Sequence, residues 1–261
     1  MLALYGSDAR QLARMRQALP VSECVVASDD WHSFEQAVPS AACAVIWMEY
    51  LADQLTFSRL SLVRHRFPRQ PVVLITQKDA DNLRHVLGLS IAGVVWSGEL
   101  PRGLCSAVQR ALVHSLFGDL ADAFASAEQL PGSLRHSLSY ACRSERPIRS
   151  VGALAAASCS DRCTLWRHWR KAVGAGAPAR LEDALHWLVL LRAVGRKSPH
   201  QAWGVVAHEL GVHHHTLSRL ARRLASRRLS DLGASDLPDL TALFVRDVLR
   251  PLVGDNADSF G

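Results

Sequence analysis

The sequence predicts a doubly wound α/β domain followed by an all-α domain. Two observations support this arrangement. Short apolar runs alternate with helix-like segments through residues 1–117, whereas residues 133–234 carry only helical patterns. The chain has 261 residues, which is enough for two ordinary domains that each form a core.

Five strands are expected in the first domain because five short runs are rich in Val, Ile and aromatic residues: Leu2–Tyr5, Glu23–Ala27, Ala42–Trp47, Pro71–Thr76 and Gly93–Trp96. Helices are expected between and after them: Ala9–Ala18, Trp31–Val38, Leu51–Phe67, Ala80–Leu89 and Leu100–Phe117. Asp8 and Asp30 are suitable N-caps for the first two helices. Strict alternation of strand and helix implies a five-stranded parallel sheet covered by helices on both faces.

This arrangement resembles the receiver domain of bacterial response regulators, and residues 71–112 carry the resemblance best. Thr76 matches the hydroxyl residue that ends a receiver strand, and Gly93 matches the start of the next strand. The resemblance implies a phosphate-accepting aspartate after the third strand, beside Mg²⁺ held by acidic residues that follow the first.

The residues for that chemistry are missing. Met48 or Glu49 occupies the acceptor position, Ser97 replaces the family's lysine, and only Asp8 remains of the acidic pair. A phosphoryl acceptor needs a carboxylate close to a metal and a cation for the developing charge. The sequence therefore predicts a pseudo-receiver with no phosphoacceptor. Glu49 is either a mimic of phosphoaspartate or an ordinary glutamate at the start of a loop.

The second half contains one pattern twice. Residues 150–173 align with residues 202–225 at an offset of 52, which places Thr164 opposite Thr216. The two copies share the core Thr-Leu-x-Arg. In each copy a short helix with small inner residues precedes a turn and a second helix, which is typical of a helix-turn-helix. Gly211 provides a permissive turn in the second copy, where the first copy has Cys159. Asp161 is a good N-cap for the second helix of its copy, and His213 is a poor one.

The second helices are expected to bury leucines and Trp169 and to expose basic faces. The residues on those faces are the candidate DNA contacts: Arg162, Trp166, Arg167 and Arg170 in the first copy, and His214, His215, Ser218, Arg219 and Arg222 in the second. Trp166 either contacts DNA or packs against a neighbouring helix. The alternative for both copies is a generic helical hairpin with a basic outer face.

The double pattern resembles the DNA-binding domain of AraC-type regulators, in which a long helix joins two helix-turn-helix units. Arg180–Val194 matches the connecting helix and Leu134–Cys142 the opening helix. The family's phenylalanine after each recognition arginine is Trp169 and Ala221 here, and its final Gly-x-Pro-x-x-Tyr-Arg stretch is not recognisable around residues 229–232. The resemblance implies a transcription regulator with double-stranded DNA and RNA polymerase as partners. Receiver-like domains also pair, so Ala80–Phe117 is the expected homodimer surface.

The expected domains are a receiver-like domain (1–117), a linker (118–132), a double helix-turn-helix domain (133–234), and a C-terminal helix with a tail (235–261). The acidic, Ala-rich linker either continues the preceding helix or contacts a partner chain. The charge distribution favours a polyanionic partner for the helical half. The chain has a net charge of +6, and residues 143–229 hold sixteen Lys and Arg against five Asp and Glu.

Other function classes have little support in the sequence. It lacks an export signal and an apolar run of about 20 residues, so we expect a cytoplasmic protein without membrane contact. No enzyme motif is present, and we expect neither a cofactor nor a metal, because three consecutive histidines cannot share one helix face. The six cysteines are expected to be core residues. The alternative function is a protein–protein adaptor whose helix-turn-helix units no longer bind DNA.

Overall fold

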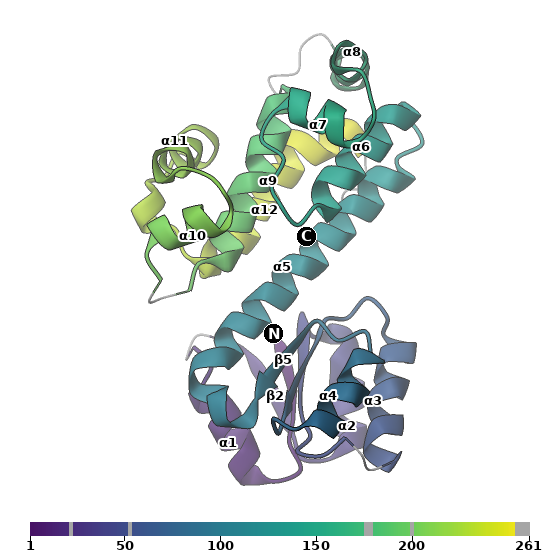
Figure 1. The fold of residues 1–261 in the computed structure, drawn as a ribbon, viewed down its shortest axis with the longest axis vertical. Helices are drawn as coiled ribbons and strands as arrows, with labels where there is room; N and C mark the ends of the chain where they lie inside the picture. The colour runs from purple at the N-terminus through teal and green to yellow at the C-terminus, as the bar shows by residue number, and fades with distance from the viewer. Residues whose placement is uncertain (21–22, 52–53, 175–179, 199–200, 254–261) are drawn as a thin grey trace. The chain divides into compact units, whose positions relative to one another are not determined.

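The computed structural model describes residues 1–20, 23–51, 54–174, 180–198 and 201–253, and the tail that follows lies outside the described residues. The chain divides into two compact units, Met1–Ser115 and Leu116–Gly261. The first is an α/β unit, and the second is helical throughout its described elements (Figure 1). None of the described helices is long and apolar enough to cross a lipid bilayer.

The first unit contains the predicted five-stranded sheet. Its strands are β1 (Leu2–Tyr5), β2 (Val25–Ser28), β3 (Cys43–Trp47), β4 (Val72–Thr76) and β5 (Gly93–Trp96). They pair in the order β2-β1-β3-β4-β5, and every pair is parallel. Strands β3 and β4 are buried along their whole length, because each has a strand on both sides and helices on both faces.

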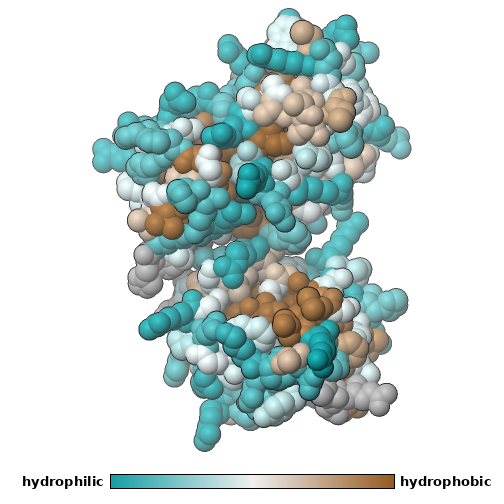
Figure 2. Space-filling model, viewed as in Figure 1, coloured by the Kyte–Doolittle hydropathy of each residue, from teal (hydrophilic) through white to brown (hydrophobic). Residues whose placement is uncertain are grey.

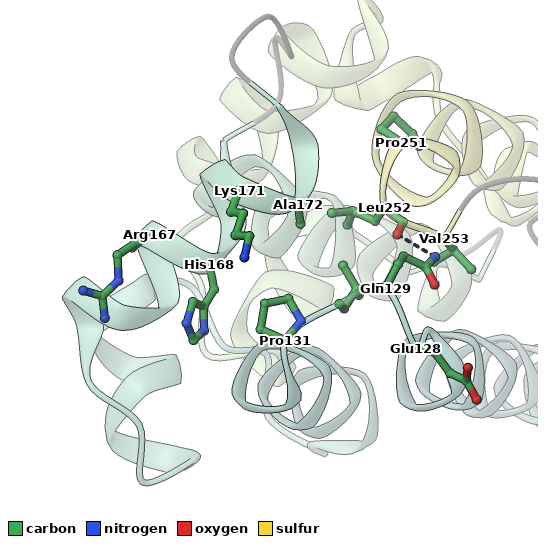
Figure 3. A pocket seen from close by; sticks show the side chains of 11 residues that line it. Glu128, Gln129, Pro131, Arg167, His168, Lys171, Ala172, Pro251, Leu252 and Val253 are labelled. Atoms are coloured by element: carbon green, nitrogen blue, oxygen red, sulfur yellow. Dashed lines mark hydrogen bonds between the residues drawn. The ribbon is translucent and has the colours of Figure 1, made fainter.

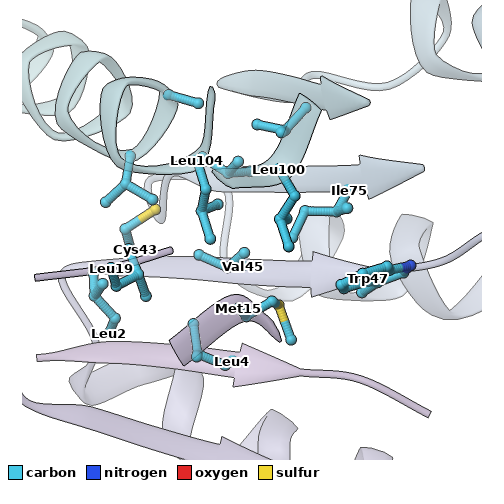
Figure 4. Packing of buried hydrophobic residues seen from close by; sticks show 14 of the residues in the cluster. Leu2, Leu4, Met15, Leu19, Cys43, Val45, Trp47, Ile75, Leu100 and Leu104 are labelled. Carbon is cyan, nitrogen blue, oxygen red and sulfur yellow. The ribbon is translucent and has the colours of Figure 1, made fainter. Parts of the chain in front are cut away.

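Helices cover both faces of this sheet, and alternate strand residues point to opposite sides. Leu4 and Val45 pack with Leu104 on one face (Figure 4). Ala3 and Ile46 belong to a second core on the other face. The helices are α1 (Ala9–Gln17), α2 (Trp31–Ala37), α3 (Gln54–Arg66), α4 (Ala80–Leu87) and α5 (Leu100–Ser126).

The predicted N-caps are present. The side chain of Asp8 accepts a hydrogen bond from the backbone N–H of Gln11 at 2.8 Å, and Asp30 accepts one from Ser33 at 2.8 Å. Helix α5 is longer than expected, because it continues past Phe117 to Ser126. Residues 118–126 of the expected linker are therefore helical.

The second unit is built around α9 (Leu181–Arg196), which is buried along most of its length. Two helix pairs pack around it: α7 (Val151–Ala157) with α8 (Arg162–Val173), and α10 (Trp203–Glu209) with α11 (His214–Ala225) (Figure 1). The other helices are α6 (Gly132–Arg143), α12 (Leu237–Phe244) and α13 (Arg250–Val253). A π-helical turn at Val245–Leu249 interrupts the single C-terminal helix that the sequence predicted.

A buried cation joins three helices of this unit. Arg192 of α9 is only 7% exposed and donates a hydrogen bond to the backbone carbonyl of Cys142, near the end of α6. Its guanidinium also lies 4.0 Å from the ring centre of Phe117 on α5. Burial lowers the pKa of Arg192 to about 10. Burial of Arg192 could not be foreseen from the sequence, in which it is one basic residue among many in the second half.

Candidate nucleic-acid interface

The two helix pairs share one backbone plan. Adding 52 to the bounds of α7 and α8 reproduces the bounds of α10 and α11. The turns agree as well, because Cys159 and Gly211 both have positive φ, at 50° and 63°. The backbone N–H of Ser160 donates a hydrogen bond to the backbone carbonyl of Ala155 at 2.9 Å. The N–H of Val212 donates to the carbonyl of Ala207 at the same distance, 2.9 Å. The sequence repeat is therefore also a repeat in backbone conformation.

The inner faces of the pairs are matched too. Leu154 and Val206 are fully buried at equivalent positions of the first helices. Leu165 and Leu217 are fully buried at equivalent positions of the second helices. Leu224, which was expected in the core, is only half-buried. Close packing of these inner faces fixes which side of α8 and α11 faces outwards.

The caps of the second helices differ in strength, as the sequence predicted. Asp161 accepts a hydrogen bond from the backbone N–H of Thr164 at 2.7 Å, and this bonding lowers the pKa of Asp161. His213 accepts only a long bond, 3.4 Å, from the N–H of His215. The rings of His213 and His215 stack, with their centroids 5.1 Å apart. The start of α11 is thus held less firmly by its cap than the start of α8.

The candidate residues of α8 lie on its outer face. Arg162, Arg167 and Arg170 are exposed, and Trp166 is 50% exposed. The guanidinium of Arg170 lies 4.7 Å from the ring centre of Trp166, which gives a cation–π contact one helical turn apart. Trp166 therefore supports a cation on the outer face, and both roles considered for it stay open.

The candidate residues of α11 also lie together. His214, His215, Arg219 and Arg222 are exposed, whereas Ser218 is half-buried. An open groove of about 550 Å³ is lined by His215, Ser218, Arg219, Arg222 and Arg223. In the space-filling view, hydrophilic residues cover most of the visible surface around α11 (Figure 2). The groove is therefore a basic surface with hydrogen-bond donors along one helix.

One arginine of this helix has a structural partner that sequence analysis missed. Arg223 forms an ion pair with Asp183 at 3.0 Å and a hydrogen bond with His186 Nδ1 at 2.7 Å, both on α9. Burial and the nearby Arg223 lower the pKa of His186. These contacts orient α11 on α9. Arg219 and Arg222 have no ion pair or hydrogen bond within the described part of the chain, so they remain available for a ligand.

An aromatic ring and a cation lie together at the carboxyl end of β3. Trp47 ends β3 and is 2% exposed, with the Arg14 guanidinium 4.9 Å from its ring centre. Arg14 also donates to the backbone carbonyl of Ser97 at 3.3 Å. Met48 is buried, and Glu49 is exposed. An indole and a guanidinium thus occupy the end of β3, while Asp8 caps α1.

The loops at this end of the sheet are tied together. The backbone carbonyl of Glu49 accepts hydrogen bonds from Thr76 Oγ1 at 3.1 Å and from Asn82 Nδ2 at 2.9 Å. Asn82 Oδ1 also accepts a hydrogen bond from the backbone N–H of Leu51 at 2.8 Å, and Asn82 is 1% exposed. Asn82 is a residue that sequence analysis missed. Asn82 Nδ2 also donates to the backbone carbonyl of Gln77 at 3.1 Å, and these three bonds hold the loops after β3 and β4 in one arrangement.

The prediction for cysteines was wrong for half of them. Cys43 and Cys142 are buried, and burial raises the pKa of each thiol to about 12. Cys24, Cys159 and Cys163 are exposed instead, because they lie in loops or on the outer face of α8. Among the described residues, no three His, Cys, Asp or Glu side chains gather as metal ligands would.

Comparisons with known proteins add no relative to this picture. No protein-family model, no curated protein and no solved structure matches the chain. The functional argument therefore rests on the geometry and charge of the two helix pairs.

Proposed function

We propose that this chain is a sequence-specific transcription regulator that binds double-stranded DNA through α8 and α11. One observation carries the proposal. The two helix pairs repeat at an offset of 52 residues, and their outer faces place arginines at equivalent positions, Arg167 with Arg219 and Arg170 with Arg222. A repeated structure with repeated exposed cations supports two similar contacts with a repetitive polyanion.

The dimensions of DNA support this assignment. The major groove of B-form DNA is about 12 Å wide and admits an α-helix. Arginine binds the edge of guanine with two hydrogen bonds and also binds phosphate. The resemblance to AraC-type regulators points to the same two helices, and it adds RNA polymerase as a possible second partner.

The receiver-like unit would then act without phosphate, as a site for pairing with a second copy of the chain. Helix α4 exposes Leu83 and Leu87, and Leu87 is 79% exposed. Figure 2 shows a hydrophobic patch where Figure 1 places α4 and β5. Both elements lie within Ala80–Phe117, the predicted homodimer surface. A dimer would bring two copies of each basic helix to the DNA.

The adaptor alternative has weaker support. Among the described residues of the second unit, the exposed large apolar side chains are Tyr140, Trp166 and Val205. They lie on three different helices, α6, α8 and α10. A protein-binding surface normally gathers such residues into one patch.

The direct test is selection from a random duplex library with the whole protein, followed by titration of the selected site. We expect affinity to fall steeply between about 50 and about 200 mM salt. The double variant Arg219→Ala/Arg222→Ala should lose most of this affinity. The control Arg66→Ala removes an exposed arginine of α3 that pairs with Glu35, outside the proposed dimer surface, and it should bind as wild type does. Equal binding by both variants would contradict the proposal.

A further inference from the structure

A chamber in the second unit lies beside α8 and shares Arg167, at its rim, with the candidate DNA contacts. It has a volume of about 960 Å³ and opens between α8, the turn that precedes α6, and α13 (Figure 3). Pockets of about 300–1,000 Å³ hold most small organic ligands. The proposed DNA contacts do not account for this chamber.

Its walls combine apolar surface with cations from one helix. Leu130, Pro131, Ala172, Leu252 and Val253 provide the apolar lining. Helix α8 provides His168 and Lys171, and Figure 3 shows the Lys171 side chain directed towards Pro131 and the His168 ring. Arg167 lies at the rim and points away.

Two hydrogen bonds fix the polar part of the lining. His168 Nδ1 is paired with Ser133 Oγ at 2.8 Å. When the hydroxyl donates to Nδ1, the neutral imidazole carries its proton on Nε2 and can donate it to an anion. Gln129 Nε2 donates to the backbone carbonyl of Leu252 at 2.9 Å, which anchors the turn to α13. The His168 ring and the apolar walls of the chamber are therefore in place before any ligand binds.

The charges in the chamber favour an anion. Lys171 is exposed and forms no ion pair within the described ranges. The acidic residue of the lining is Glu128, which Figure 3 places at the opposite end, beyond Gln129. Within the described part of the chain the Lys171 cation has no carboxylate partner. Beside an apolar wall it is complementary to a molecule with one anionic group and an apolar body.

We propose that this chamber binds a small amphipathic anion, with its carboxylate, sulfonate or phosphate group on Lys171 and His168. The apolar body of the ligand lies against Pro131 and Leu252. The proposal does not depend on DNA binding, because neither Lys171 nor His168 belongs to the DNA contacts assigned above.

The test uses the fluorescent anion anilinonaphthalene sulfonate with the whole protein in the absence of DNA. Lys171→Ala should lower the affinity for the anion by about tenfold or more, as loss of a hydrogen bond to a charged group does. Lys171→Arg, which keeps the charge, should restore most of the affinity. Arg170→Ala is the matched control, since it removes the neighbouring cation of α8 outside the chamber.

A neutral analogue, phenylnaphthylamine, separates the charge contact from simple apolar binding. Its affinity should be the same for wild type and Lys171→Ala. The proposal is overturned if Lys171→Ala binds the anion as wild type does. It is also overturned if the neutral analogue loses as much affinity as the anion. Fluorescence that persists equally in every variant reports binding elsewhere, for example on the apolar surface of α4, and counts against the chamber.

Discussion

The guanidinium of Arg14 lies over the ring of Trp47, 4.9 Å from its centre, at the carboxyl end of β3. In a receiver domain this end of the sheet holds a carboxylate and a divalent cation. Here a side-chain cation and an indole lie at the end of β3, and the carboxylate of Glu49, two residues further on, is exposed.

The first prediction is that small phosphodonors do not modify the protein. Treatment with acetyl phosphate and Mg²⁺ should leave the intact mass unchanged, because no carboxylate follows β3 in the acceptor position except the exposed Glu49. A response regulator with an intact receiver domain, treated in parallel, verifies the donor. A stoichiometric phosphoryl adduct on this chain would show that the pseudo-receiver interpretation is wrong.

The second prediction concerns the different roles of α8 and α11. Arg219→Ala should cost about 1–3 kcal/mol on the preferred site and relax the preference at one base pair, because α11 offers donors without a bulky neighbour. Arg170→Ala should weaken all duplexes about equally and reduce the salt slope by about one unit. Titrations against preferred and scrambled sites at several salt concentrations measure both effects. The reverse pattern would exchange the two roles.

The third prediction tests the backbone of the repeated turns. Cys159 has a positive φ, which costs a non-glycine residue about 1–2 kcal/mol, whereas glycine adds a chain-entropy cost of about 0.5–1 kcal/mol. Cys159→Gly should therefore stabilise the protein by up to about 1 kcal/mol. Gly211→Ala should destabilise the protein by about 1 kcal/mol, because Gly211 also has a positive φ. No steric clash adds to this cost, since a Cβ at Gly211 would meet no atom within 4 Å.

Urea unfolding measures these changes, and Gly204→Ala is the matched control. Gly204 lies within α10, and a Cβ there also meets nothing within 4 Å. Alanine should stabilise this helical position by up to about 1 kcal/mol. If Gly211→Ala behaves like Gly204→Ala, the turn after α10 does not need the left-handed conformation.

The fourth prediction is a pH dependence of stability that comes from His186. Its pKa is held below the usual 6.5 by burial and by Arg223, so the folded state favours the neutral ring. As pH falls through about 6.5, the unfolded chain takes up the proton first. The stabilisation is therefore present above this pH and is lost below it. Neutral His186 also accepts the hydrogen bond from Arg223.

Urea unfolding at about pH 7.5 and about pH 5.5 detects this loss, since histidine titrates in that interval. The variant His186→Gln should lose less stability than wild type over the same interval. Any loss of stability that does not involve His186 is common to both proteins, so it cancels in the comparison. An equal loss in both would mean that His186 is not held in its neutral form.

The sequence was sufficient for features that depend on local pattern. Apolar runs located all five strands, and the caps Asp8, Asp30 and Asp161 were identified because a short acceptor before a helix has one common use. The repeat was visible because equivalent positions keep Thr-Leu-x-Arg. The end of α5 was left open between a continued helix and a partner contact, since Gly118 and the acidic residues after it are weak helix signals that packing overrides.

Features that depend on distant contacts could not be predicted. Asp183 and Arg223 lie forty positions apart in the sequence, and only the packing of α11 on α9 brings them together. The chamber beside α8 forms from segments that are separated in the same way. The basic composition of the second half also concealed Arg192, because one buried arginine among many exposed ones has no local signature.

Arg192 also constrains how this chain can vary over evolution. Its guanidinium is shared by the Cys142 carbonyl and the Phe117 ring, so three helices depend on one cation. Removing one partner of a buried charge typically costs about 3–5 kcal/mol, whereas replacing the whole group with apolar residues of similar volume is often neutral. Substitutions at positions 117 and 192 should therefore be inherited together. Among divergent descendants of this chain, these positions would change as a correlated pair, while the exposed arginines of α8 and α11 change one at a time.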